Sequence, residues 1–145
     1  MENCQSRQQK IINEFSAIHG WEARYKKIID IGKSLTPLAD ELKKDELKVK
    51  GCQSQVWIHA SLDEKGRILF QGDSDALIVR GLVSLILQIY SGCSPDEILE
   101  IEPTFIKEIG LESHLSPSRT NGLSAMIRQI KYYAAAFKAL QERKP

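Results

Sequence analysis

The strongest constraint on the fold is an apolar run from Ala76 to Ile89 near the middle of the chain. As a helix, this run carries aliphatic side chains around most of its circumference and has no wide polar face for water. It is also too short and too often interrupted to cross a bilayer. The interrupting residues are Arg80, Gly81, Ser84 and Gln88. We therefore predict a helix from Asp75 to about Tyr90 at the buried centre of the fold, with a close neighbour opposite Gly81, where an interior glycine weakens the helix.

Length indicates one domain, and the polar start of the chain indicates an intracellular protein. The chain has 145 residues, and its 20 basic and 19 acidic side chains nearly cancel. Such a balance gives no attraction toward phosphate, so no nucleic-acid partner is expected. The first ten residues are polar and lack the apolar segment of a secretory signal. We expect a single domain over residues 1–145, located in the cytoplasm, without a membrane partner.

Before the apolar helix, the sequence alternates with a period of two. The apolar members of the alternation are Val56, Ile58, Ala60 and Leu62. Residues 63–66, Asp-Glu-Lys-Gly, are typical of a hairpin connection, and residues 67–71 return as a second strand. A third short strand near residues 47–50 would complete a small antiparallel sheet of about three strands. Residues 72–75 are predicted to end the sheet and cap the central helix through Asp73 or Ser74.

Helices are predicted on both sides of this unit. Apolar residues at helical spacing indicate helices over residues 5–18 and 21–31, with Gly32 as the expected C-terminal cap. After the central helix, Ser94-Pro95 begins a short helix, and a longer amphipathic helix runs through Leu123 to Leu140. The predicted fold class is α+β, with the small sheet packed against the buried central helix and further helices.

Cys52 is the candidate reactive residue. It follows Gly51, precedes the polar residues Gln53 and Ser54, and lies just before the first strand. This pattern places the thiol on a turn, where it would be exposed. A free cysteine is also commonly a small buried apolar residue, so the local pattern leaves the reactive and the structural interpretation open.

No other residue pattern assigns a reaction. A helix N-terminus or a cation such as Arg119 would lower the pKa of a nearby thiol, whereas the carboxylate of Asp75 would raise it. Spacing alone favours a helix-cap acid for Asp75 and a surface residue for Arg119. Nothing in the surroundings of the three histidines marks any of them as the base of a cysteine protease. The three are His19, His59 and His114.

The other two cysteines, Cys4 and Cys93, show no recognisable pattern. Three cysteines far apart in the sequence match neither a disulfide framework nor a Cys-x-x-Cys pair, which fits a reducing compartment. We expect Cys4 on a fraying terminus and Cys93 near a helix end. A metal site is not predicted, because paired ligand spacing is lacking.

Four segments, in a fixed order, carry a resemblance to a known family. They are Gly51-Cys52-Gln53-Ser54-Gln55-Val56-Trp57, Gly72-Asp73-Ser74-Asp75-Ala76, Ile78-Val79-Arg80-Gly81-Leu82, and Leu115-Ser116-Pro117-Ser118-Arg119 with Gly122-Leu123. In sequence and spacing they closely resemble the SufE family of sulfur-acceptor proteins, over residues 11 to 135. A single glycine-cysteine pair would mean little, but four separated motifs are specific.

The resemblance implies a partner and a covalent role for Cys52. The partner would be a pyridoxal-phosphate cysteine desulfurase of the SufS type, which holds sulfur as a persulfide. Cys52 would accept that sulfur, stimulate the desulfurase, and pass the sulfur to an iron–sulfur scaffold such as the SufBCD complex. No cofactor is expected on this chain, because the pyridoxal phosphate belongs to the partner, and the protein would be an accessory carrier and not a stand-alone enzyme.

The resemblance also implies roles around the thiol. The cysteine loop would lie over an apolar floor, with Gly51, Gln53, Asp75 and Arg119 as residues that hold the loop or face the partner. Two alternatives stay open: a binding module that activates the desulfurase without its thiol, and an iron–sulfur scaffold. A scaffold of the IscU type, whose fold is similar, needs three cysteines converging on one site, and their spacing is absent here.

Overall fold

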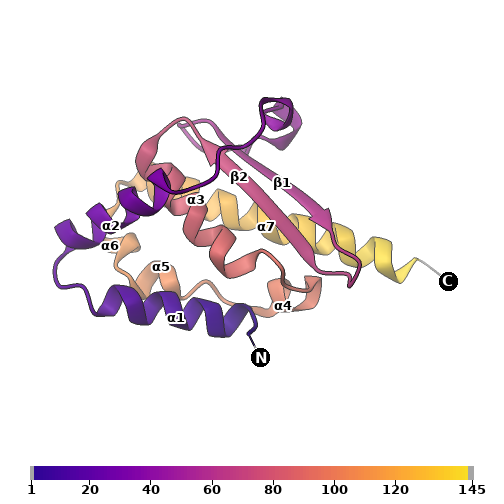
Figure 1. Ribbon diagram of the computed structural model, residues 1–145, viewed down its shortest axis with the longest axis horizontal. Helices are drawn as coiled ribbons and strands as arrows, with labels where there is room; N and C mark the ends of the chain where they lie inside the picture. The colour runs from indigo at the N-terminus through magenta and orange to yellow at the C-terminus, as the bar shows by residue number, and fades with distance from the viewer. Residues whose placement is uncertain (1, 144–145) are drawn as a thin grey trace.

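The computed structural model describes residues 2–143 and confirms the α+β class (Figure 1). Its helices and strands follow in the order α1 (Cys4–Ser16), α2 (Trp21–Lys33), η1 (Asp40–Leu42), η2 (Asp45–Leu47), β1 (Val56–Leu62), β2 (Ile68–Ser74), α3 (Leu77–Tyr90), α4 (Pro95–Glu100), α5 (Phe105–Glu108), α6 (Leu111–His114) and α7 (Pro117–Glu142).

Helix α3 is the predicted buried centre. Figure 1 shows it between the hairpin of β1 and β2 and helix α1, and its main packing partners are α2 and β2. Most of its side chains are almost inaccessible to solvent, and Leu82, Val83, Ile86 and Ile89 are fully buried. Burial of aliphatic side chains on all sides is the main source of stability for such a helix.

Helices α2 and α3 cross with their backbones in close contact at two glycines. A side chain on Gly81 would overlap the carbonyl group of Ile28, and one on Gly32 would come within 2.7 Å of the Gly81 nitrogen. The predicted close neighbour of Gly81 is therefore confirmed. The prediction that Gly32 caps α2 is wrong, because the helix continues to Lys33 and Gly32 is needed for the crossing.

The sheet consists of two antiparallel strands, β1 and β2, with Val56 opposite Ser74 and Leu62 opposite Ile68. In the described residues the expected third strand is reduced to a single bridge between Lys48 and Trp57. The 3-10 turn η2 occupies the preceding residues and leaves too little extended chain for a ladder.

The chain between the sheet and α3 also differs from the prediction. Strand β2 continues through Ser74, and the residue before α3 is Ala76, which makes no side-chain cap. Asp73 is instead buried, where it accepts hydrogen bonds from the backbone nitrogens of Leu38 and Ser74. Its carboxylate also lies 3.5 Å from Arg80, so it ties the segment after α2 to the start of α3.

The N-terminal residues are more ordered than the sequence indicates. Asn3 caps α1: its side chain accepts a hydrogen bond from the backbone nitrogen of Ser6. The Ser6 hydroxyl in turn accepts one from the backbone nitrogen of Asn3. Cys4 is buried in the first turn and forms a disulfide with Cys93. The prediction that Cys4 lies on a fraying terminus is therefore wrong, and so is the expectation that the cysteines form no disulfide. Cys93 lies just beyond the end of α3, as predicted.

Helix α7 runs beside the hairpin and is fastened to it at two points (Figure 1). The Tyr133 hydroxyl donates to the carbonyl of Ile58 at 3.1 Å, and the Gln141 amide donates to the carbonyl of Gly66 at 3.2 Å. Within residues 2–143, no helix combines the length and the apolar character needed to span a membrane.

Candidate functional site

Cys52 lies on a turn between Val49 and β1, as predicted. Gly51 has a φ of 94°, a left-handed conformation that glycine adopts without strain. On one side of the turn, the Val49 nitrogen donates to the carbonyl of Val56 at 2.8 Å. The segment that carries the thiol is thus attached directly to the first residue of the sheet.

Asp75 holds the other side of this turn. Its carboxylate accepts a hydrogen bond from the Gln55 nitrogen at 3.0 Å, and its own backbone nitrogen donates to the Gln55 carbonyl at 3.2 Å. These two contacts join the end of the cysteine loop to the chain that leads into α3. Asp75 is exposed and does not line the cavity beside Cys52.

The thiol is half-buried against α7. Its sulfur lies 3.5 Å from the carbonyl oxygen of Gly122, to which it donates a hydrogen bond. A methyl group on Gly122 would lie 3.3 Å from the same sulfur. Because carbon atoms rarely approach side chains so closely, the missing side chain at position 122 makes room for the thiol.

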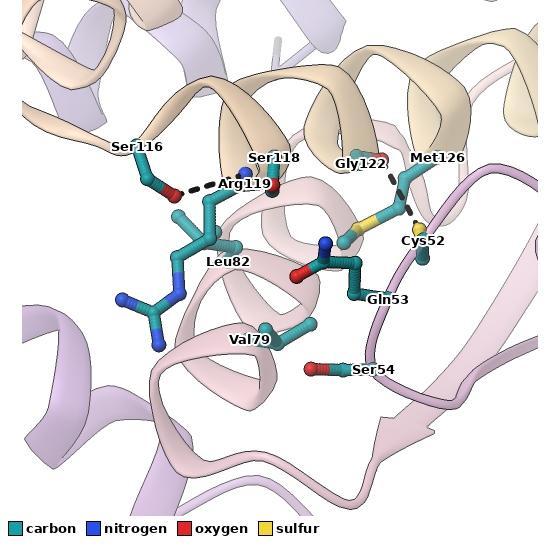
Figure 2. A pocket seen from close by; sticks show the side chains of 10 residues that line it. All are labelled: Cys52, Gln53, Ser54, Val79, Leu82, Ser116, Ser118, Arg119, Gly122 and Met126. Carbon is teal, nitrogen blue, oxygen red and sulfur yellow. Dashed lines mark hydrogen bonds between the residues drawn. The ribbon is translucent and has the colours of Figure 1, made fainter.

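A cavity of about 340 Å³ opens beside Cys52 (Figure 2). It lies between the cysteine loop, α3 and the beginning of α7. Its apolar floor comes from Val79, Leu82 and Met126, and its polar residues are Gln53, Ser54, Ser116, Ser118 and Arg119. Figure 2 shows the Gln53 side chain extending from the loop into this cavity. A small, partly apolar cavity next to a thiol limits its contact with bulk water, and the open side of the cavity keeps the thiol accessible.

Burial and one cation act on the thiol in opposite directions. Desolvation raises the pKa of Cys52, and the positive charge of Arg128 partly offsets this rise. The raised pKa keeps the group protonated near neutral pH, so it is a weak nucleophile at rest. Neither Arg119 nor Asp75, the two charges considered from the sequence, contributes to this shift.

The arrangement does not supply the partners of a cysteine protease or of a cluster scaffold. No histidine is among the described residues that line the cavity, so a base is missing. Cys4 and Cys93 do not line it either, because they are bonded to each other elsewhere. The three cysteines therefore do not converge on one site.

Of the residues predicted around the thiol, Gln53 and Arg119 line the cavity, Gly51 precedes Cys52 in the turn, and Asp75 contacts the loop at Gln55. Sequence reasoning assigned no role at the thiol to Gly122, Met126 or Arg128. One signal was available. Gly122 and Met126 are four residues apart on one helix, and a glycine in a helical pattern often marks a close approach.

Comparison with solved structures identifies the fold. The chain is similar to the solution structure of a hypothetical protein from Thermus thermophilus, with a TM-score of 0.76 and 21% sequence identity. The match covers 92% of this chain and 96% of that one. At this identity the likeness concerns the fold alone.

Comparison with protein families is more specific. The model of one family, described as "SufE: Fe-S metabolism associated domain", matches residues 9–134. The matched range includes the cysteine loop, the cavity and the glycine beneath the thiol. It spans most of the chain and associates the protein with iron–sulfur metabolism. The chain belongs to the SufE family.

Proposed function

We propose that the protein accepts sulfur from a cysteine desulfurase and carries it as a persulfide on Cys52. The observation that carries this proposal is the half-buried thiol on a turn beside a cavity of about 340 Å³. The cavity has room for an additional sulfur atom, and its floor of Val79, Leu82 and Met126 would shield that atom from water and oxidants.

The transfer needs no external oxidant or reductant. The Cys52 sulfur attacks the outer sulfur of the partner's cysteine persulfide, and the sulfur–sulfur bond of that persulfide breaks. A new sulfur–sulfur bond forms on Cys52, the partner's cysteine leaves as a thiolate, and the proton from Cys52 neutralises it. The rate of such an exchange depends on the thiolate fraction, on the leaving group and on access.

The resting geometry supports a step that is controlled by docking. At rest the thiol is protonated and donates to Gly122, so it reacts slowly. A partner that draws the loop outward would break this hydrogen bond and expose the sulfur. In this proposal Gln53 and Arg119 face the partner, whereas Gly51 and Asp75 set the course and the attachment of the loop.

The partner we propose is a pyridoxal-phosphate cysteine desulfurase of the SufS type. Acceptance of its sulfur would free that enzyme for another turnover, so the protein also acts as an activator. The sulfur would then pass to a scaffold of the SufBCD type for cluster assembly. These partners would place the protein in the cytoplasm.

The decisive experiment is a mass measurement after incubation with a SufS-type desulfurase and free cysteine. We expect the mass of one sulfur atom to be added to the tryptic peptide of residues 51–65, which holds Cys52. Cys52→Ser should lose both this addition and the stimulation of the desulfurase. The double variant Cys4→Ala/Cys93→Ala is the matched control and should keep both.

Two results would contradict the proposal. The first is a wild-type protein that gains no mass while it binds and stimulates the enzyme. The second is full stimulation by Cys52→Ser, which would support a binding module whose thiol is inert.

A further inference from the structure

Cys4 and Cys93 meet at the end of the molecule where α1 contacts the chain after α3. They are separated by 89 residues in the sequence, yet their Cα atoms lie 6.2 Å apart and their sulfurs are bonded. Their exposed fractions are 2% and 1%. Neither cysteine lines the cavity beside Cys52, so the pair is a separate feature of the fold.

The backbone around each cysteine is well fixed. The Cys4 nitrogen lies 3.3 Å from a carboxylate oxygen of Glu97 and donates to it. The Cys93 carbonyl accepts a hydrogen bond from Ile68 at 2.9 Å, which attaches it to the start of β2. Arg7, one turn after Cys4, donates to the carbonyl of Ser91. The two cysteines are therefore held face to face by contacts that do not involve their sulfur atoms.

Two chemistries fit a buried pair of cysteines, and the geometry favours one of them. The ligand atoms of Cys4, Cys93 and Glu97 lie within 4.8 Å of one another, as in a partial metal site. A zinc ion, however, is normally held by four ligands in a structural site. The described residues offer three in this cluster. The Cα separation of 6.2 Å lies within the range of ordinary disulfides.

We propose that Cys4 and Cys93 form a reversible redox site, closed by a small disulfide such as oxidised glutathione. One cysteine thiolate attacks the glutathione disulfide, forms a mixed disulfide and releases one glutathione thiol. The second cysteine then attacks the protein sulfur of that mixed disulfide and releases the other. Two protein thiols are oxidised to one disulfide, and one glutathione disulfide is reduced to two thiols. Opening of the first turn of α1 admits the reagent.

Closure of this site has two consequences. It joins α1 covalently to the end of α3, across a long loop of chain, which stabilises the fold by restricting the unfolded chain. It also leaves Cys52 as the single thiol of the protein, because the chain contains three cysteines. Both consequences hold whether or not Cys52 carries sulfur, so the inference stands apart from the proposed function.

The test begins with the fully reduced full-length protein and adds oxidised glutathione alone. We expect the number of titratable thiols in denatured protein to fall from three to one. We also expect tryptic peptides 1–7 and 81–107, which hold Cys4 and Cys93, to become linked. Reduction of the closed protein should lower its Tm by about 5–15 °C. The Tm of Cys4→Ala/Cys93→Ala should not respond to the reductant, and Cys52→Ser should behave like the wild type.

Other results would overturn the inference. Three titratable thiols after prolonged oxidation, or a link between Cys52 and either other cysteine, would show that the pair does not close. Zinc retained by the reduced protein, with both thiols protected from alkylation, would show a metal site instead. No desulfurase is present in these measurements, so their failure is distinguishable from failure of the proposed function.

Discussion

Two cysteine environments at different places in this fold give the same side chain opposite properties. Cys52 lies on a turn, half-buried, with one hydrogen bond to the Gly122 carbonyl and an open cavity beside it. Cys4 and Cys93 lie in the core, bonded to each other and backed by α1 and α3. The fold thus leaves one sulfur as a free thiol beside a cavity and holds the other two in a buried disulfide.

The contrast also bears on the proposed sulfur transfer, because it would affect how faithfully the sulfur is held at one position. A carrier with three reactive thiols would have three places to hold the cargo. In the proposed transfer, Cys4 and Cys93 would not compete with Cys52 while they are buried and bonded to each other. Each of the following measurements probes whether the two environments differ as much as the structure indicates.

The largest expected difference is in the alkylation rates of the reduced, native protein. Cys52 should react with iodoacetamide about tenfold faster or more than Cys4 or Cys93, because the reagent reaches the buried pair only when the fold opens locally. Peptide mass spectrometry at successive times gives all three rates. Equal alkylation rates of the three cysteines in the native protein would contradict this prediction. As a control, the three rates should become equal in denaturant.

A smaller effect is expected from Gly122→Ala. The added methyl would lie 3.3 Å from the Cys52 sulfur, so the thiol must rotate away and lose its hydrogen bond to the carbonyl. We expect the alkylation rate of Cys52 to rise severalfold, with stability changed by less than about 1 kcal/mol because alanine favours the helix.

Ser124→Ala is the matched control for this change, on the same helix but outside the cavity lining. It should leave the alkylation rate of Cys52 unchanged. An unchanged rate in Gly122→Ala as well would mean that the thiol does not depend on the space at position 122.

The smallest effect is expected from Arg128→Gln. Removal of this charge should raise the pKa of Cys52 further, since Arg128 lowers it and burial raises it. The rise of the alkylation rate with pH should therefore shift to higher pH, and only slightly, because Arg128 is exposed and its charge is screened by salt. Both proteins should reach the same rate when the thiol is fully ionised.

Lys138→Gln removes a positive charge from the same helix, at a residue that pairs with Asp96, and should leave the profile unchanged. A downward shift in Arg128→Gln would show that this arginine does not stabilise the thiolate.

Features that depend on neighbouring residues could be predicted from the sequence. The apolar run identified α3 as the buried centre, and alternating residues identified β1 and its hairpin with β2. The glycine before Cys52 correctly indicated a turn, because a left-handed conformation is a property of one residue.

Features that depend on contacts between distant segments could not be predicted from the sequence. Gly32 looks like a helix cap until α3 is placed against it, and the contact of Gly122 with the thiol joins positions 70 residues apart. The pairing of Cys4 with Cys93 has no local pattern at all. Strand β2 runs farther than its composition indicates because Asp73, a poor strand residue, is held by Leu38 and Arg80.

The attachments on either side of the cysteine loop set how far its sulfur can travel. Val49 is hydrogen-bonded to Val56, and Gln55 is hydrogen-bonded to Asp75. Only the few residues between Val49 and Gln55 can therefore move without breaking these bonds. A loop this short cannot carry the Cys52 sulfur far from the surface of the protein. If Cys52 carries sulfur as proposed, a donor or acceptor protein would have to bring its own reactive group almost to the surface of this protein.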